Sequence, residues 1–154
     1  MSTPESRLAE LGITLPEPMA AVANYVPFVI TGNQLFVSGQ VSVGPDGLVT
    51  GRLGEDMSLE EGQAAARLCA LNLIAQCKAA VSDLSRIKRV VKLGGFVNAH
   101  PDFVQIPQVI NGCSDVMVDV FGDAGKHSRS AVGVNALPLD VPVEIDALIA
   151  LKPA

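Results

Sequence analysis

The sequence predicts an α+β fold, a two-layer sandwich in which two helices cover one face of a six-stranded mixed sheet. Three observations support this fold class. Short apolar runs bounded by turn residues indicate strands, two longer stretches carry apolar residues at helical spacing, and the order is strands, helix, strand, helix, strands. The 154 residues are expected to form one domain (1–154), with an N-terminal extension over 1–24 and a core over 25–151.

The first predicted elements are a short helix and a hairpin. Residues 5–11 can form two helical turns, which Gly12 ends. Strands are expected over 26–31 and from Gln34 onward, because the Gly32-Asn33 pair between them tolerates the positive φ of a two-residue turn. A short further strand is expected over 48–53.

Two helices and a strand form the middle of the chain. Ser58 and Glu61 have the spacing of a capping box, which predicts a helix from this point to about Val81. Residues 87–98 are expected to form a strand. A second helix is expected over 107–121, with proline in its first turn, where a missing amide costs nothing.

The last two strands are predicted over 130–136 and 143–151. In the final strand, Val143 and Ile145 point one way, while Leu148 points the other way, so both faces of the sheet carry apolar residues. Since both helices cover one face, the second apolar face would be bare. Such a face usually finds a partner, which favours an oligomer.

Composition limits the classes of function. A formal net charge of −5 disfavours general binding to nucleic acid or to anionic membranes. Cys69 and Cys77 are eight residues apart in a predicted helix, roughly 12 Å along its axis, too far for a disulfide. No metal-ligand cluster, signal peptide or long apolar run is visible, so we expect no metal and a cytoplasmic location.

Two blocks near the C-terminus resemble a known family signature. Arg129-Ser130 opens the pattern Arg-Ser-x-Val-x-Val-x-x-Leu-Pro, and residues 143–147 read Val-Glu-Ile-Asp-Ala. This pattern resembles the RidA/YjgF family, also labelled endoribonuclease L-PSP. Tyr25 and the Ser38-Gly39-Gln40 segment are similar to the family's corresponding residues, so the resemblance covers residues 22–151. The longer N-terminus looks like a subgroup called chorismate mutase-like after its fold.

The resemblance implies a homotrimer with a central β-barrel and clefts between neighbouring subunits. It also implies hydrolysis of reactive enamines and imines to a keto acid and ammonia without a cofactor. The substrates would be of the 2-aminoacrylate, 2-iminopropanoate or 2-iminobutanoate type. Arg129 would clamp the substrate carboxylate, because a guanidinium matches it with two parallel hydrogen bonds. Glu144 would hold the attacking water or move a proton.

Five further residues are expected to bind substrate. Tyr25 and Asn111 would line the pocket, Gly39 would allow close approach of backbone to ligand beside Ser38, and the Ser130 amide could bind an anion. For Tyr25 and Asn111 the alternative is a structural hydrogen bond, and for Gly39 it is a turn or bulge. The alternative for Arg129 and Glu144 is an ordinary surface or interface ion pair.

This chain departs from the usual family pattern at several positions. Ala131 stands where many members have Cys, which removes thiol chemistry there. His127-Ser128 replaces Pro-Ala, and Ala23-Asn24 replaces Gly-Pro, which bears on pocket shape. We interpret His127 as a loop histidine and Asp146 as structural. The alternative function is a non-catalytic trimeric sensor of keto acids or related small carboxylates, and ribonuclease or mutase activity is the least favoured.

Overall fold

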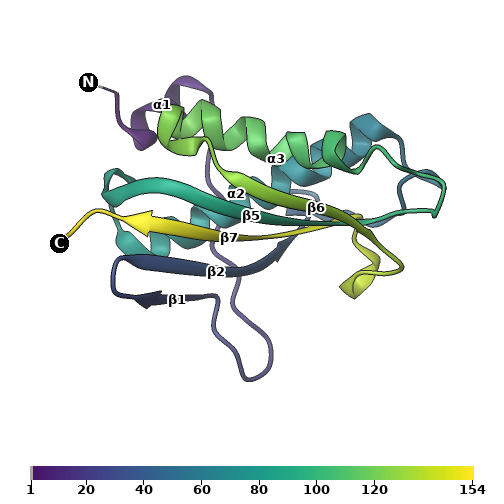
Figure 1. Cartoon of the computed structure of the whole chain (residues 1–154), viewed down its shortest axis with the longest axis horizontal. Coiled ribbons are helices and arrows are strands. Elements are labelled where there is room, and N and C mark those ends of the chain that lie inside the picture. Colours follow the sequence, from purple (N-terminus) through teal and green to yellow (C-terminus); the bar gives the residue numbers. More distant parts are fainter. Residues whose placement is uncertain (1) are drawn as a thin grey trace.

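A computed structural model describes residues 2–154 of the chain (Figure 1). The helices are α1 (Pro4–Glu10), α2 (Leu59–Val81) and α3 (Ile106–Phe121), with short 3-10 turns at η1 (Leu84–Arg86), η2 (Gly122–Gly125) and η3 (Pro138–Asp140). The strands are β1 (Phe28–Thr31), β2 (Gln34–Val41), β3 (Val43–Gly44), β4 (Gly47–Leu48), β5 (Ile87–Asn98), β6 (Ser128–Val134) and β7 (Val143–Leu151). The element order confirms the α+β class.

The main sheet has five strands in the order β1-β2-β7-β5-β6, so the prediction of six strands was wrong. Neighbours are antiparallel except β5 and β6, which are parallel and are connected through α3. The sheet is therefore mixed, as predicted. Both α2 and α3 run along the same face of it (Figure 1).

The missing sixth strand is the one predicted over 48–53. Its first residue belongs to β4, which pairs only with β3 in a separate two-stranded ribbon. Gly51 and Gly54 then adopt positive φ values of 143° and 81°, which interrupt an extended chain. Leu53 between them makes only isolated bridges, although its side chain is fully buried. The strand predicted over 48–53 was therefore wrong beyond its first residue.

Local signals elsewhere were reliable. The hairpin forms as predicted, with Thr31 opposite Gln34 across Gly32-Asn33. The capping box is also present: Ser58 Oγ accepts from the Glu61 amide at 3.2 Å, and Glu61 Oε1 accepts from the Ser58 amide at 3.1 Å. Each satisfies a backbone donor that the first turn of a helix leaves free.

The core lies between the helices and the covered face of the sheet. In β7, Val143, Ile145 and Ala147 are buried on this face. The opposite face carries Phe36 at 44% and Val132 at 45% exposure. The prediction of apolar residues on both faces is confirmed, and the homotrimer stays a prediction.

Within residues 2–154, α2 is the one helix whose length and apolarity would allow it to cross a membrane. In the structure, 61% of its most apolar window is buried. It packs against the sheet and α3, and its buried amides bond to other elements: Asn72 donates to the carbonyls of Val41 and Val43 at 3.1 and 3.0 Å. These are the features of a core helix.

We predict that Gly112→Ala destabilises the fold by about 3 kcal/mol, the upper end of the usual range for overpacking. Gly112 is where α3 approaches α2, and an added Cβ would overlap the backbone carbonyl of Gln63, which cannot rotate away. Urea denaturation would measure the loss. The matched control is Gly133→Ala, whose Cβ would meet only the flexible tip of Ile106 at 3.3 Å. Equal stability of the two variants would contradict the close helix contact.

Candidate functional site

A β-bulge shapes the first part of the site. The pairing of β2 with β7 shifts by one residue between Val37 and Gln40, which places Ser38 and Gly39 in the bulge. Ser38 ties this bulge to the segment before β1, because its Oγ donates to the Val26 carbonyl at 2.8 Å. Gln40, which is buried, donates through Nε2 to the Ser38 carbonyl at 3.0 Å.

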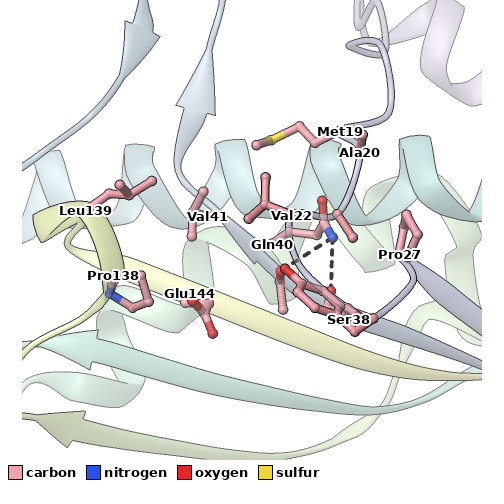
Figure 2. A pocket seen from close by; sticks show the side chains of 13 residues that line it. Met19, Ala20, Val22, Pro27, Ser38, Gln40, Val41, Pro138, Leu139 and Glu144 are labelled. Atoms are coloured by element: carbon pink, nitrogen blue, oxygen red, sulfur yellow. Dashed lines mark hydrogen bonds between the residues drawn. The ribbon is translucent and has the colours of Figure 1, made fainter.

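Beside the bulge lies a cavity of about 360 Å³, here called the Glu144 cleft. Its lining comes from the N-terminal extension (Met19 to Val22), from Tyr25 and Pro27, from the bulge (Ser38 to Val41), from Pro138 and Leu139, and from Glu144. Figure 2 shows Pro138 and Leu139 at one end of the cleft and Met19, Ala20 and Val22 at the other, with Glu144 projecting between them. Most of this lining is apolar.

Glu144 and Gly39 are in direct contact within this cleft. A Cβ on residue 39 would lie 2.7 Å from Glu144 Oε2, so glycine at this position makes room for the carboxylate. Burial raises the pKa of Glu144, and the nearby charge of Asp146 raises it further. No salt bridge among residues 2–154 includes Glu144.

Because its pKa is raised in the folded protein, Glu144 contributes to the free energy of unfolding in a way that depends on pH. The folded state holds this proton more tightly than the unfolded chain does, so the stability it contributes is complete below the unfolded pKa and is lost as pH rises through the folded pKa. We therefore expect Glu144→Gln to raise Tm at about pH 8 and to leave it unchanged at about pH 3.5, where both side chains are neutral. Calorimetry at the two pH values measures this. An equal difference at both would mean that another charge, such as a neighbouring subunit's cation, stabilises the carboxylate.

Arg129 belongs to a second, separate group of side chains. It lies in β6 opposite Leu93, which is fully buried, so it points to the helix-covered face of the sheet. Its Nη1 donates to Ser114 Oγ at 3.0 Å, and its Nη2 donates to the Pro107 carbonyl at 3.4 Å. The side chain is half-buried and makes no ion pair with any carboxylate of the described chain. A desolvated cation without an acid partner can accept an anionic ligand.

Asn111 shares the helix face that contacts Arg129. It lies four residues after Pro107 and three before Ser114, the two α3 residues that accept hydrogen bonds from the guanidinium. Ser130 instead points to the opposite face, where it lines a shallow cavity with Phe96 and Asp146. Its hydroxyl is therefore separated from Arg129 by the sheet.

Arg129 and Glu144 lie on opposite faces of the sheet of one chain. Arg129 pairs with Leu93 of β5, and both side chains lie on the helix-covered face. Glu144 pairs with Phe96, which is three residues after Leu93 in the same uninterrupted register. Because side chains alternate between faces along a strand, Glu144 points to the opposite face. The structure thus divides the predicted site into two half-sites. The Glu144 half-site holds Tyr25, Ser38, Gly39 and Glu144, and the Arg129 half-site holds Arg129 and Asn111.

Sequence reasoning missed several residues of these half-sites. The extension reaches the Glu144 cleft because Gln76 of α2 donates to the Met19 carbonyl at 2.7 Å, a contact between distant segments that no local pattern signals. Leu139 lies over the cleft with a φ of 62° and 68% exposure, which is rare for a leucine. Ser114 could have been found by its helical spacing from Asn111.

The cysteines lie outside both half-sites. All three are free and buried, and burial raises the pKa of each thiol, to about 12 for Cys77. Such thiols are poor nucleophiles. Residues 2–154 contain no group of three or more His, Cys, Asp and Glu side chains placed to hold a metal ion.

The fold defines a class: small α+β proteins in which two helices cover one face of a five-stranded mixed sheet. A family model described as YjgF/chorismate mutase-like, with endoribonuclease named as an unproven activity, matches residues 5–149. The chain belongs to this YjgF/RidA family.

Three relatives illustrate the match. Protein TCP17 of Trypanosoma cruzi is 50% identical over 151 residues, which cover 96% of this chain and 93% of that protein. The crystal structure of Atu1372 from Agrobacterium tumefaciens, a protein of unknown function, has 49% identity and a TM-score of 0.90 over 97% of this chain and 92% of its own. E. coli TdcF with bound serine has 31% identity and a TM-score of 0.61, covering 89% of this chain and 94% of TdcF.

Proposed function

We propose that the protein hydrolyses reactive enamine and imine intermediates of the 2-aminoacrylate type to a keto acid and ammonia, at a cleft between subunits of a homotrimer. One observation carries the proposal. Within residues 2–154, Arg129 has no acid partner on one face of the sheet, and Glu144, a carboxylate of raised pKa, has no cation partner on the other. The Arg129 half-site supplies a cation, the Glu144 half-site supplies a carboxylate, and the proposed reaction needs both.

Assembly of three copies would bring such half-sites together. The sheet order makes β6, with Arg129, one edge, while the Glu144 cleft lies beside β2 toward the other edge. A head-to-tail contact that closes into a ring can place β6 of one copy against the cleft of the next. The apolar bare face with Phe36 and Val132 would then be covered inside the ring, as a central barrel of sheets requires.

The chemistry follows from the two side chains. Arg129 would hold the carboxylate of the imine through two N–H groups. An enamine such as 2-aminoacrylate first becomes the imine, as its terminal carbon gains a proton and its nitrogen loses one. Glu144 would take a proton from water while the water oxygen bonds to the imine carbon, and would pass that proton to the nitrogen. In the resulting carbinolamine the hydroxyl proton moves to the nitrogen through Glu144, the C–N bond breaks, and ammonia leaves with the keto acid as the second product. In total, one imine and one water give one keto acid and one ammonia, and the reaction needs no cofactor.

The bound serine of TdcF supports the size and charge of the ligand, because serine is a three-carbon amino acid with a carboxylate. Tyr25 and Gly39 line the Glu144 cleft, and Asn111 lies beside Arg129, in agreement with substrate-binding roles. Ser130 could take part only through its backbone amide. RNA cleavage fits the net charge of −5 less well.

A keto acid sensor is the second candidate. The contacts that hold Arg129 come from α3 alone and do not involve Glu144, so this half-site could bind a carboxylate without turnover. Calorimetry with 2-ketobutyrate separates the two functions: binding without turnover, unchanged in Glu144→Ala, would favour the sensor. In either case we expect no nucleic-acid or membrane partner and a cytoplasmic location.

The direct test generates 2-aminoacrylate in situ and measures ammonia release, with the size of the protein determined by light scattering. We expect release above the spontaneous rate and a mass near three times 16.0 kDa. A monomer with full activity would overturn the shared cleft. A trimer that binds 2-ketobutyrate without accelerating release would overturn the hydrolase.

A further inference from the structure

A chain of hydrogen bonds runs from the turn after α3 to the guanidinium of Arg129. His127 Nδ1 lies 2.6 Å from the Gly125 carbonyl, and its Nε2 lies 2.9 Å from Ser114 Oγ. Arg129 Nη1 then donates to the same Ser114 Oγ at 3.0 Å. The contacts join η2, α3 and the segment that leads into β6, so they connect three elements at the arginine.

The chemistry of the groups fixes the direction of two of the three bonds. A carbonyl only accepts, so His127 Nδ1 carries a proton and donates to Gly125. A guanidinium only donates, so Ser114 Oγ accepts from Arg129. The third bond depends on the His127 ring: Ser114 Oγ donates to Nε2 of a neutral ring and accepts from Nε2–H of a doubly protonated ring. In both arrangements Ser114 Oγ accepts from Arg129.

This arrangement leaves Arg129 able to bind a ligand. A guanidinium has five N–H donors, and two of them are used, by Ser114 and by the Pro107 carbonyl. Three remain, which is enough for a two-point contact with a carboxylate. Because a free arginine side chain loses about 2 kcal/mol of rotamer freedom when it is fixed, holding it beforehand strengthens ligand binding.

We infer that Ser114 and His127 are positioning residues that hold Arg129 in its ligand-binding orientation. The inference rests on the proposed function, since Arg129 must bind the carboxylate for its orientation to matter. It also gives a role to the His127-Ser128 departure from the family pattern, because a proline at residue 127 could not make these bonds. His127 does lie in the loop before β6, as interpreted from the sequence, and the inference adds a role for it.

The test is calorimetric titration with 2-ketobutyrate, with Tm measured for each variant to confirm folding. Ser114→Ala and His127→Ala are each expected to weaken binding about 10-fold, the effect of one hydrogen bond to a charged group. His127→Gln, which can still accept from Ser114, should stay within about 3-fold of wild type.

The outcomes separate this inference from the proposed function. If Arg129→Ala abolishes binding while Ser114→Ala binds like wild type, the inference is overturned and the carboxylate clamp stands. If wild type binds no 2-ketobutyrate, the clamp fails, and crystal structures decide the inference: Arg129 ordered in wild type and disordered in Ser114→Ala supports it, and equal order in both rejects it.

Discussion

Replacing Arg129 with alanine is expected to lower kcat/KM for 2-aminoacrylate by about 100- to 10,000-fold, because two charge-assisted hydrogen bonds are lost, each worth about 1.5–3 kcal/mol. The effect should be large because the side chain is half-buried and is already oriented by Ser114 and Pro107. Calorimetry should show loss of 2-ketobutyrate binding in the same variant. The Tm should change little, since Arg129 makes no ion pair within residues 2–154.

Two control variants make this result specific. Arg129→Lys keeps the charge but not the planar fork, so it should recover only part of the activity. Arg67→Ala removes an exposed cation from the surface of α2 and should behave as wild type. If Arg129→Ala and Arg67→Ala have the same kcat/KM, the carboxylate clamp is wrong.

Elements with local signals could be predicted from the sequence. The two-residue turn at Gly32-Asn33, the capping box at Ser58 and the proline in the first turn of α3 each fix backbone geometry within a few residues. The strand predicted over 48–53 failed for a related reason. The apolar residues there include one buried side chain, Leu53, but two glycines with positive φ remove the chain from the sheet.

No local sequence pattern could predict that Arg129 and Glu144 lie on opposite faces of the sheet. Whether Arg129 and Glu144 share a face depends on the parallel register of β6 on β5 and the antiparallel register of β7 on β5, which pair residues far apart in the chain. A shift of one residue in either ladder would reverse the result. The extension over the Glu144 cleft depends in the same way on a distant contact, from Gln76 to Met19.

Replacing Glu144 with glutamine should affect turnover and ligand binding differently. Glu144→Gln is expected to lower kcat about 100- to 1,000-fold, the usual contribution of a general base, while the affinity for 2-ketobutyrate changes by less than about 3-fold. The amide keeps the size of the side chain beside Gly39 but cannot take a proton from water. Ammonia-release kinetics and calorimetry on the same variant measure the two quantities.

The pH profile identifies the group responsible. If Glu144 is the base, kcat/KM rises with pH as it ionises. Burial and Asp146, which raise the pKa of Glu144, move this limb to higher pH, and in the proposed trimer Arg129 of the partner subunit moves it to lower pH. Asp146→Asn removes the repelling charge, so the limb should move to lower pH while full activity is kept above it. In Glu144→Gln the limb should vanish. A limb that stays in place in both variants would assign the proton transfer to another group and leave Glu144 as part of the cleft wall.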